Sequence, residues 1–324
     1  MSFPKIPPVE GQIVPPDNEE EQKAQAIRSW KLAGLGFAVL AAALFSVKPV
    51  LIKLVYAEGV DTWTLMLLRM AMSMPFVFLV AWHAYSQRTA GGIATDLSWQ
   101  TLGRAAGLGL LANYTAQYCD MLGLHYISAQ FERLIVFTYP TLVVLILAIF
   151  MKQRISGNVI VALIVCYLGL ALIFGHDLTT FGADVVTGAG LVFLSALFFA
   201  IYFVLSKDII RLVGSRIFTF LTIASATIAI GVHFSFVNDV AQLNQSMKVY
   251  GLILIIALTG TVFPLLLLAE AIDRIGPSRT SIAGGVGPIF TSIAAVLILG
   301  ETFTIYHGVG SALIIAGVIM IARK

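Results

Sequence analysis

Long apolar segments repeat along nearly the whole chain, and their length restricts the fold more than any other feature of the sequence. From Leu32 onward, segments of about twenty apolar residues alternate with short polar breaks, and a helix of that length crosses a hydrocarbon core of ~30 Å. Hydrophobic residues make up 59% of the chain and charged residues 11%, whereas roughly a quarter of a soluble domain is charged. The sequence therefore predicts an all-α polytopic membrane protein.

We count about ten apolar segments, each long enough to span a bilayer. The expected spans are Leu32–Ala57, Thr62–Ala84, Leu102–Leu124, Ser128–Met151, Gly157–Gly175, Val185–Ser206, Ile217–Phe236, Val249–Ala271, Ser278–Leu299 and Phe303–Ala322.

Residues 1–30 precede the first span and are rich in proline and then in acidic residues. Such a segment cannot bury a core, so we expect a disordered cytoplasmic tail. It does not resemble a signal peptide, because the first apolar run begins only at Leu32 and is long enough to span.

The distribution of Lys and Arg predicts the orientation. With the amino terminus in the cytoplasm, nearly all basic residues fall in inner loops, while the outer loops hold little besides Lys248 and carry acidic residues instead. Both termini are therefore expected on the cytoplasmic side. A net charge of +3 is too small to suggest nucleic acid as a partner, so the expected partners are the lipid bilayer and a small-molecule substrate.

An internal repeat divides the chain into residues 31–175 and 185–324. A constant offset aligns Tyr139-Pro140 with Gly287-Pro288 and Gln153 with Glu301. Each half has five expected spans, and an odd number makes the second copy enter from the opposite face. The expected architecture is two inverted five-helix repeats, which transporters use to build a site between the halves.

Charged residues inside the spans are the main candidates for function. Glu132 and Arg133 lie in one apolar run, and an ionised group at membrane depth costs at least ~2.5 kcal/mol, so both should face protein or a wet cavity. Counting ~1.5 Å of rise per residue, Lys48, Arg69 and this pair all lie roughly 6 to 14 Å from the outer ends of their spans. One outer vestibule could therefore collect them. A local ion pair of Glu132 with Arg133 or Arg69 that only fixes packing is the alternative.

The third span adds a polar stripe to this cluster. Asn113, Gln117 and Asp120 recur at helical spacing, and Tyr114 and Tyr118 flank them. A stripe of this kind more often lines a cavity than faces lipid.

The predicted cluster contains three cations, Lys48, Arg69 and Arg133, and two carboxylates, Asp120 and Glu132. The excess positive charge favours an anionic or zwitterionic substrate. Arg69 or Arg133 could hold a carboxylate, Lys48 could act as a point charge, and Glu132 could bind an amino group or carry a proton. Lys48 could instead extend toward the outer headgroups, as is expected for Lys53. The second half is less polar, with Tyr202 at the position equivalent to Lys48. The predicted substrate-binding residues are Lys48, Arg69, Asn113, Tyr114, Gln117, Glu132, Arg133 and Tyr202.

Prolines and glycines within the spans are the candidate hinge positions. Pro140 removes a hydrogen bond in the middle of its expected span, and the glycines of the ninth span serve either close packing or gating. The predicted hinge residues are Pro49, Pro140, Gly284, Gly285, Gly287 and Pro288.

Nothing in the sequence indicates an enzyme, a cofactor or a metal site. The chain lacks GxSxG, HExxH and Walker motifs, and its two cysteines are not spaced as ligands. The histidines, at positions 83, 125, 176, 233 and 307, are dispersed without metal-ligand spacing. Without an ATP-binding motif, uphill transport would depend on an ion gradient or on exchange.

The repeated pattern resembles the drug/metabolite transporter superfamily, specifically its EamA-type members. The resemblance is strongest in GPSRTSIAGGVGPIFTSIAAVLILGETFT of the second copy, in LGLHYISAQFERLIVFTYPTLVVLILAIFMKQRIS of the first, and at Arg69 in LMLLRMAMSMPF. Gln153 stands where the family usually has an acidic residue, and the Glu132-Arg133 pair is not general to the family. The resemblance implies a carrier of the bacterial inner membrane that works by alternating access and often exports metabolites.

We therefore expect a secondary active transporter of a small anionic or zwitterionic metabolite, such as an amino acid or organic acid, acting in export, with a coupling proton or a counter-substrate. Efflux of hydrophobic or cationic toxic compounds is one alternative, since tyrosines could line such a pocket. A membrane sensor or scaffold without transport is the other, although a scaffold does not need charges across several spans.

Overall fold

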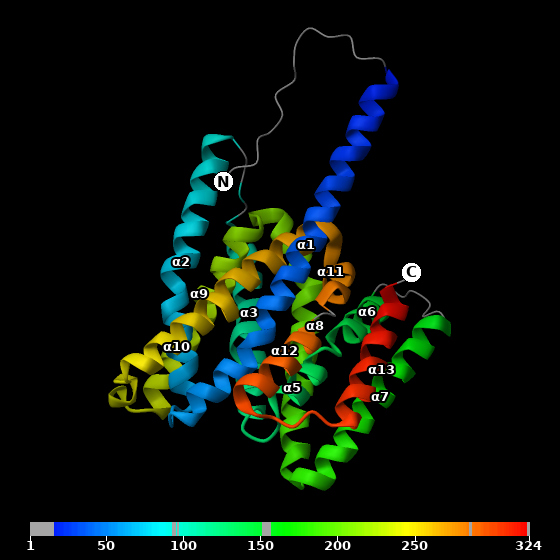
Figure 1. Cartoon of the computed structure of the whole chain (residues 1–324). Helices are drawn as coiled ribbons and strands as arrows, with labels where there is room; N and C mark the ends of the chain where they lie inside the picture. The colour runs from blue at the N-terminus through cyan, green and yellow to red at the C-terminus, as the bar shows by residue number, and fades with distance from the viewer. Residues whose placement is uncertain (1–15, 93–94, 96, 151–156, 285–286, 323–324) are drawn as a thin grey trace.

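The computed structural model describes residues 16–92, 95, 97–150, 157–284 and 287–322, which form a bundle of helices without strands (Figure 1). Seven segments are helices long and apolar enough to cross a membrane, and two shorter apolar helices follow them near the carboxyl end. The long ones are Arg28–Ala57, Thr62–Ala90, Ala129–Ile149, Ile160–Thr179, Asp184–Val213, Ser215–Val237 and Met247–Ala283. This composition and length confirm the expected all-α polytopic membrane fold.

The helices follow one another with short connections. In chain order they are α1 Pro16–Ala57, α2 Thr62–Ala90, α3 Trp99–Gly109, η1 Leu110–Ala116, α4 Gln117–Gly123, α5 Ala129–Val136, α6 Tyr139–Phe150, α7 Gly157–Phe181, α8 Asp184–Val213, α9 Ser215–Val237, η2 Val240–Leu243, α10 Met247–Ala257, η3 Leu258–Val262, α11 Phe263–Ala283, α12 Gly287–Ala294, η5 Ala295–Leu299 and α13 Ile305–Ala322.

Several of these helices join into single passes through the bundle. The third pass is α3, η1 and α4 together, and α10, η3 and the first part of α11 form the eighth. Gly276, with φ of 81°, breaks α11, and the rest of that helix begins the ninth pass with α12 and η5. The start of α1 and the end of α13 both lie at the upper ends of their helices (Figure 1), as an even number of passes requires.

The two halves repeat irregular features at matching places. A π-helix begins at Leu110 in the third pass and at Leu258 in the eighth. The first helix of the fourth pass ends at Val136, and that of the ninth pass ends at Ala283. The π-helices follow the offset that aligns Tyr139-Pro140 with Gly287-Pro288, and the two helix ends follow it to within one residue, so the repeat extends to the local backbone.

One of the candidate hinge prolines occupies a different place from that expected. Pro140 is the second residue of α6, where a missing N–H leaves no hydrogen bond unmade. The expectation that Pro140 sits inside a continuous helix is therefore wrong, because the helix breaks just before it. Pro49 lies inside α1, which continues through it to Ala57. Of the candidate hinge glycines, Gly285 lies outside the described residues.

The first helix begins earlier than expected. Residues 1–30 were expected to form a disordered tail, whereas α1 is helical from Pro16. Proline suits the start of a helix, and the Glu, Gln, Lys and Ala residues that follow have high helix propensity. The amino-terminal turns of α1 extend beyond the other helices (Figure 1).

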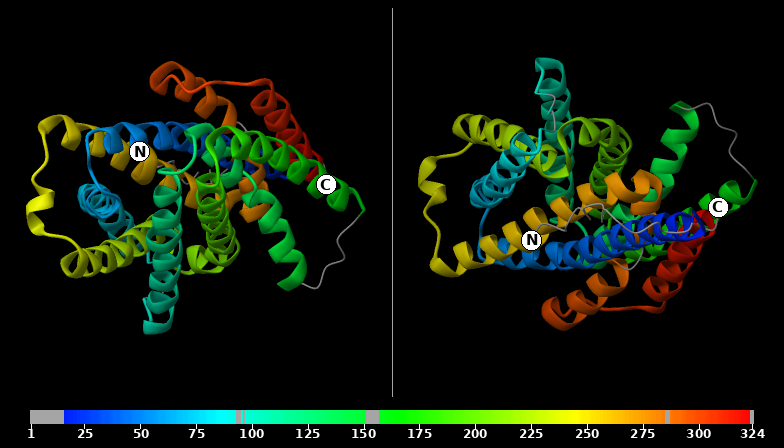
Figure 2. Two further views of the ribbon diagram at one scale, coloured as in Figure 1. Left: turned by 90° about the horizontal axis from the view of Figure 1, so that it is seen from below. Right: turned by 90° about the horizontal axis from the view of Figure 1, so that it is seen from above.

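Contacts between the halves hold the bundle together. Helix α1 packs against α11, α2 against α9, and α7 against α13 (Figure 2). The last pair is very close, because a Cβ built on Gly310 would lie 2.7 Å from the Gly169 carbonyl oxygen. Small residues at such contacts let helix backbones approach in a membrane, where dispersion contacts drive association.

Candidate functional site

A cavity of about 50 Å³ lies between the two halves of the chain. Helices α1, α4, α5 and α6 contribute lining residues from the first half, and α8 and α11 from the second. This volume holds on the order of a few water molecules, so the cavity is small. The cavity is lined by Ala38, Ala42, Phe45, Lys48, Ala116, Gln117, Asp120, Glu132, Arg133, Val136, Tyr139, Ser195, Ala196, Phe199, Phe203, Leu268, Thr280 and Gly284.

Lys48 forms the centre of the polar network. Its Nζ donates to Asp120 Oδ2 at 2.7 Å and to Gln117 Oε1 at 2.8 Å. Lys48 is 6% exposed and Asp120 is 4% exposed, so this is a buried ion pair. The side chain therefore points into the protein and not toward the headgroups.

Arg69 lies behind this network and does not line the cavity. It is fully buried, and its Nη1 donates to Gln117 Oε1 at 3.2 Å. Its Nε and Nη2 have no hydrogen-bond partner among the described residues. Gln117 Oε1 thus accepts from two cations, which fixes the orientation of its amide.

Asp120 and Glu132 form a pair of buried acids that both line the cavity. Asp120 Oδ1 and Glu132 Oε2 have no hydrogen-bond partner among the described residues. Glu132 is 2% exposed, and within the described part of the chain it makes no ion pair with Arg69 or Arg133. The ion pair with an arginine that was the alternative expectation is therefore not seen there.

Arg133 is half-buried and faces the cavity opposite this acid pair. Its Nη2 makes one long hydrogen bond, 3.5 Å, to the Ala42 carbonyl oxygen, and no described carboxylate lies within ion-pair distance. A Cβ built on Gly287 would lie 2.9 Å from the same Nη2. The guanidinium therefore rests against Gly287 of α12.

Aromatic side chains form the remaining wall of the cavity. Tyr139 donates its hydroxyl to the Ser281 carbonyl oxygen at 3.1 Å, and its ring packs against Phe199 and Phe203. A Cβ built on Gly284 would lie 2.5 Å from the Tyr139 hydroxyl. Gly284 and Gly287 therefore both permit close approach of a cavity side chain.

Besides Arg69, three predicted substrate-binding residues lie away from the cavity. Tyr114 hydrogen-bonds His233 Nδ1 at 2.5 Å, in an aromatic group with Trp63. Asn113 is buried in η1, and its amide has no partner among the described residues. Tyr202 is buried between Phe199 and Phe218. For Asn113 and Tyr114 the expectation assumed a regular helix, but the π-helix changes which faces the third pass presents.

Some lining residues were not predicted. Ser195 and Phe203 come from α8, where a sequence of small and aromatic residues is indistinguishable from ordinary packing. The alignment of the two repeats had singled out Glu301, without predicting its contacts. Its carboxylate accepts from the backbone N–H of Ala129 at 2.8 Å and of Gln130 at 3.2 Å. It caps the amino end of α5, the helix that carries Glu132 and Arg133.

Lys53 also belongs to this cap. Its Nζ lies 3.6 Å from Glu301 Oε1, so it pairs with this carboxylate. We expected Lys53 to extend toward the headgroups. Gln153, the residue aligned with Glu301, lies outside the described residues.

An all-α membrane bundle with a polar cavity between two repeated halves defines the class of membrane transporters. The profile of the EamA-like transporter family matches residues 32–175 and again residues 186–323. The chain therefore belongs to the EamA-like transporter family, and the resemblance to EamA-type members of the drug/metabolite transporter superfamily is confirmed.

Individual relatives agree with this assignment. The chain is 28% identical over 286 residues to the uncharacterized transporter YcbK of Bacillus subtilis (strain 168), covering 86% of this chain and 89% of that protein. It is 23% identical over 229 residues to an uncharacterized transporter of Archaeoglobus fulgidus, covering 70% and 80%. A solved crystal structure superposes with a TM-score of 0.64 at 14% identity, covering 90% of this chain and 96% of that one, so this similarity concerns the fold.

Proposed function

We propose that the chain is a secondary active transporter of a small anionic or zwitterionic metabolite, such as an amino acid or organic acid, and that the substrate binds in the cavity between the halves. In this proposal it works by alternating access in the bacterial inner membrane, with both termini cytoplasmic, and exports its substrate.

The unpaired Arg133 guanidinium carries the proposal. Lys48 is neutralised by Asp120, so Arg133 is the lining cation without a carboxylate partner in the described part of the chain. A planar guanidinium binds a carboxylate through two parallel hydrogen bonds, and such bonds are strong in a nearly dry cavity.

The acid pair supplies the proposed coupling site. Buried carboxyls are neutralised by binding a proton, and a substrate ammonium group that replaces this proton would use the same oxygen atoms, of which Asp120 Oδ1 and Glu132 Oε2 have no partner among the described residues. Exchange of a proton for substrate at one site is a direct way to couple export to proton entry. A counter-substrate that binds at the same cavity is the other form of coupling, and transport with and without a pH gradient separates the two.

The first experiment is thermal unfolding of the purified protein with a panel of amino acids, organic acids and nucleobases. A ligand at 100 times its Kd stabilises the folded form by about 2.7 kcal/mol. We expect carboxylate compounds to stabilise the parent protein and to lose this effect in Arg133→Ala. The matched control is Arg104→Ala, since Arg104 is exposed on α3 and lies outside the cavity. Stabilisation that survives in Arg133→Ala would refute the assignment of the site.

The aromatic wall favours a second candidate, efflux of hydrophobic cations. Phe45, Tyr139 and Phe199 line the cavity and could bind a cation through their ring faces. Cationic dyes belong in the same panel for this reason. Stabilisation by dyes alone, equal in the parent and in Arg133→Ala, would favour efflux over metabolite transport.

Transport itself needs reconstitution. Proteoliposomes loaded with a stabilising compound should release it when a pH gradient is imposed, and Glu132→Gln should abolish the response to the gradient. Reporter fusions at the two ends of the chain test the proposed cytoplasmic termini.

A further inference from the structure

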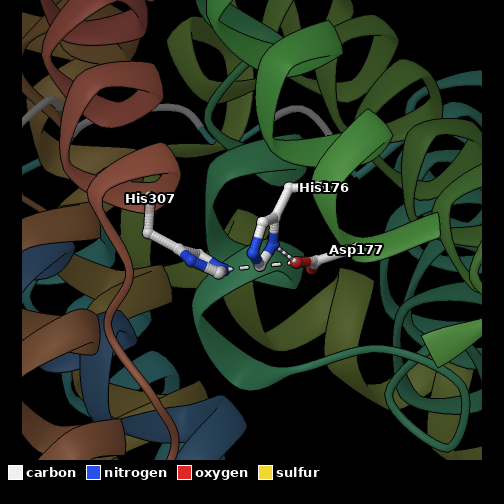
Figure 3. A group of neighbouring side chains, drawn as sticks. All are labelled: His176, Asp177 and His307. Atoms are coloured by element: carbon white, nitrogen blue, oxygen red, sulfur yellow. Dashed lines mark hydrogen bonds and ion pairs between the residues drawn. The ribbon is translucent and has the colours of Figure 1, made fainter. Parts of the chain in front are cut away.

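Three side chains that are far apart in the sequence meet between α7 and α13. His176 and Asp177 point from α7 toward His307, which extends from α13 (Figure 3). His176 Nδ1 lies 3.2 Å from Asp177 Oδ1, and His307 Nε2 lies 3.6 Å from the same oxygen. One ligand atom from each residue lies within 4.8 Å of the other two. The positions of the histidines in the sequence do not predict this cluster, because the contact between His176 and His307 depends on the packing of the fifth pass against the tenth.

These separations suit a tetrahedral metal ion. With metal–ligand bonds of about 2.0–2.1 Å, neighbouring ligand atoms of a tetrahedral site are about 3.3 Å apart. The two measured separations lie on either side of this value. Imidazole nitrogen with one carboxylate oxygen is a ligand set that Zn²⁺ accepts, whereas Mg²⁺ and Ca²⁺ prefer oxygen ligands alone.

The burial of Asp177 is a second observation that favours a cation. The residue is 1% exposed and His307 is 3% exposed. An ionised carboxylate buried this deeply needs a compensating charge, and neutral imidazoles do not provide one. A divalent ion between the three groups would provide it.

The surroundings of His307 support ligation through Nε2. Thr304 Oγ1 hydrogen-bonds the other ring nitrogen, Nδ1, at 2.8 Å, which orients the ring and leaves Nε2 directed at Asp177. Metal-bound histidines usually have such a partner on the second nitrogen.

A neighbouring pocket gives access to the three side chains. Asp177 and His307 both line a pocket of about 430 Å³, which has room for a water as fourth ligand. Lys53 also lines it, and its charge is compensated by Glu301.

We propose that His176, Asp177 and His307 form a binding site for a divalent transition-metal ion, with Zn²⁺ as the best fit and the fourth position open to the pocket. The ion bridges α7 of the first half to α13 of the second. The site is separate from the transport cavity and does not depend on the identity of the substrate.

The test is titration of Zn²⁺ into the full-length, tag-free protein after treatment with a chelator, followed by calorimetry and by the visible absorption of Co²⁺ as a spectroscopic substitute. We expect one ion per chain and a tetrahedral Co²⁺ spectrum. Asp177→Asn and His307→Gln should remove both signals. His83→Ala is the matched control, because His83 is exposed on α2, and it should bind as the parent does.

Thr304→Val tests the proposed role of the second nitrogen. It keeps the three ligands and removes the hydrogen bond to Nδ1, so Zn²⁺ affinity should fall by about 10- to 100-fold. The parent protein itself decides the question even if a variant folds poorly. Failure of the parent to bind one Zn²⁺ per chain, or binding that is equal in folded Asp177→Asn, would overturn the proposal and leave a hydrogen-bonded bridge between the two helices.

Discussion

The buried Lys48–Asp120 pair allows a quantitative test of how the cavity is held together. Asp120→Leu removes the carboxylate and leaves the Lys48 ammonium with Gln117 Oε1 as its remaining hydrogen-bond partner in the described structure. Removing one member of a buried ion pair costs about 3–5 kcal/mol, because the other charge stays buried without compensation. Both side chains are almost completely buried, so no discount for solvent screening applies.

The reverse substitution should cost less. Lys48→Met leaves the buried Asp120 without its cation, and a buried acid that has lost its partner can become neutral by binding a proton. We expect a loss of about 1–3 kcal/mol, the cost of a buried polar group that has lost one partner. The double variant replaces both charges with apolar side chains of similar size, which is often nearly neutral. Its loss should therefore be smaller than that of Asp120→Leu alone.

Equilibrium unfolding in mixed detergent micelles, with fluorescence as the signal, measures the free energy of unfolding of the parent, the two single variants and the double variant. The double-mutant cycle should give a coupling energy of at least about 2 kcal/mol. Losses that add to within about 0.5 kcal/mol would show that Lys48 and Asp120 are independent, and the buried network would then not stabilise the cavity.

Three further predictions concern the periphery of the site. Gly310→Ala should lower the unfolding free energy by about 1–3 kcal/mol, because the added Cβ would meet the α7 backbone. Gly175 has open space around it, so Gly175→Ala is the control that should not lower it. Thermal melts of the two variants test this. Burial and the nearby Lys53 cation lower the pKa of His125 in the folded protein, so the imidazole takes up a proton at a higher pH in the unfolded chain. The stability of the fold should therefore fall as the pH drops below about 6.5. His125→Gln should reduce this pH dependence in a series of thermal melts from pH 8 to pH 5. Glu301→Gln removes a charged cap from α5 and should cost about 1 kcal/mol in chemical unfolding, with the exposed Glu58→Gln as a control that costs little.

The sequence predicts best those features whose absence would cost the most free energy in a membrane. Unsatisfied backbone groups and unpaired charges are costly in lipid, so the apolar segments predict the passes. The charged residues within those segments, Lys48, Glu132 and Arg133, indicate the cavity that the structure describes. The offset of the repeat also predicts which segments should deviate together. The π-helices that begin at Leu110 and at Leu258 occur at matching positions.

The wrong placement of Asn113 and Tyr114 comes from local backbone geometry. A π-helix in the third pass turns Asn113 and Tyr114 away from the face that a regular 3.6-residue period assigns them, while Gln117 and Asp120, in the α-helix that follows, reach the cavity. The residue type at each position gives no sign of this extra residue per turn. Contacts between distant passes, such as His176 with His307, require the fold itself.

The close contact between α7 and α13 has a mechanical consequence for the movement of the two halves. At Gly169 and Gly310 the backbone of each helix lies close to the other, so a wider spacing would lose dispersion contacts between the two backbones. We expect α7 and α13 to stay in contact when the two halves move relative to each other. His176, Asp177 and His307 join the same two helices, so an ion bound there would add a second link between the halves.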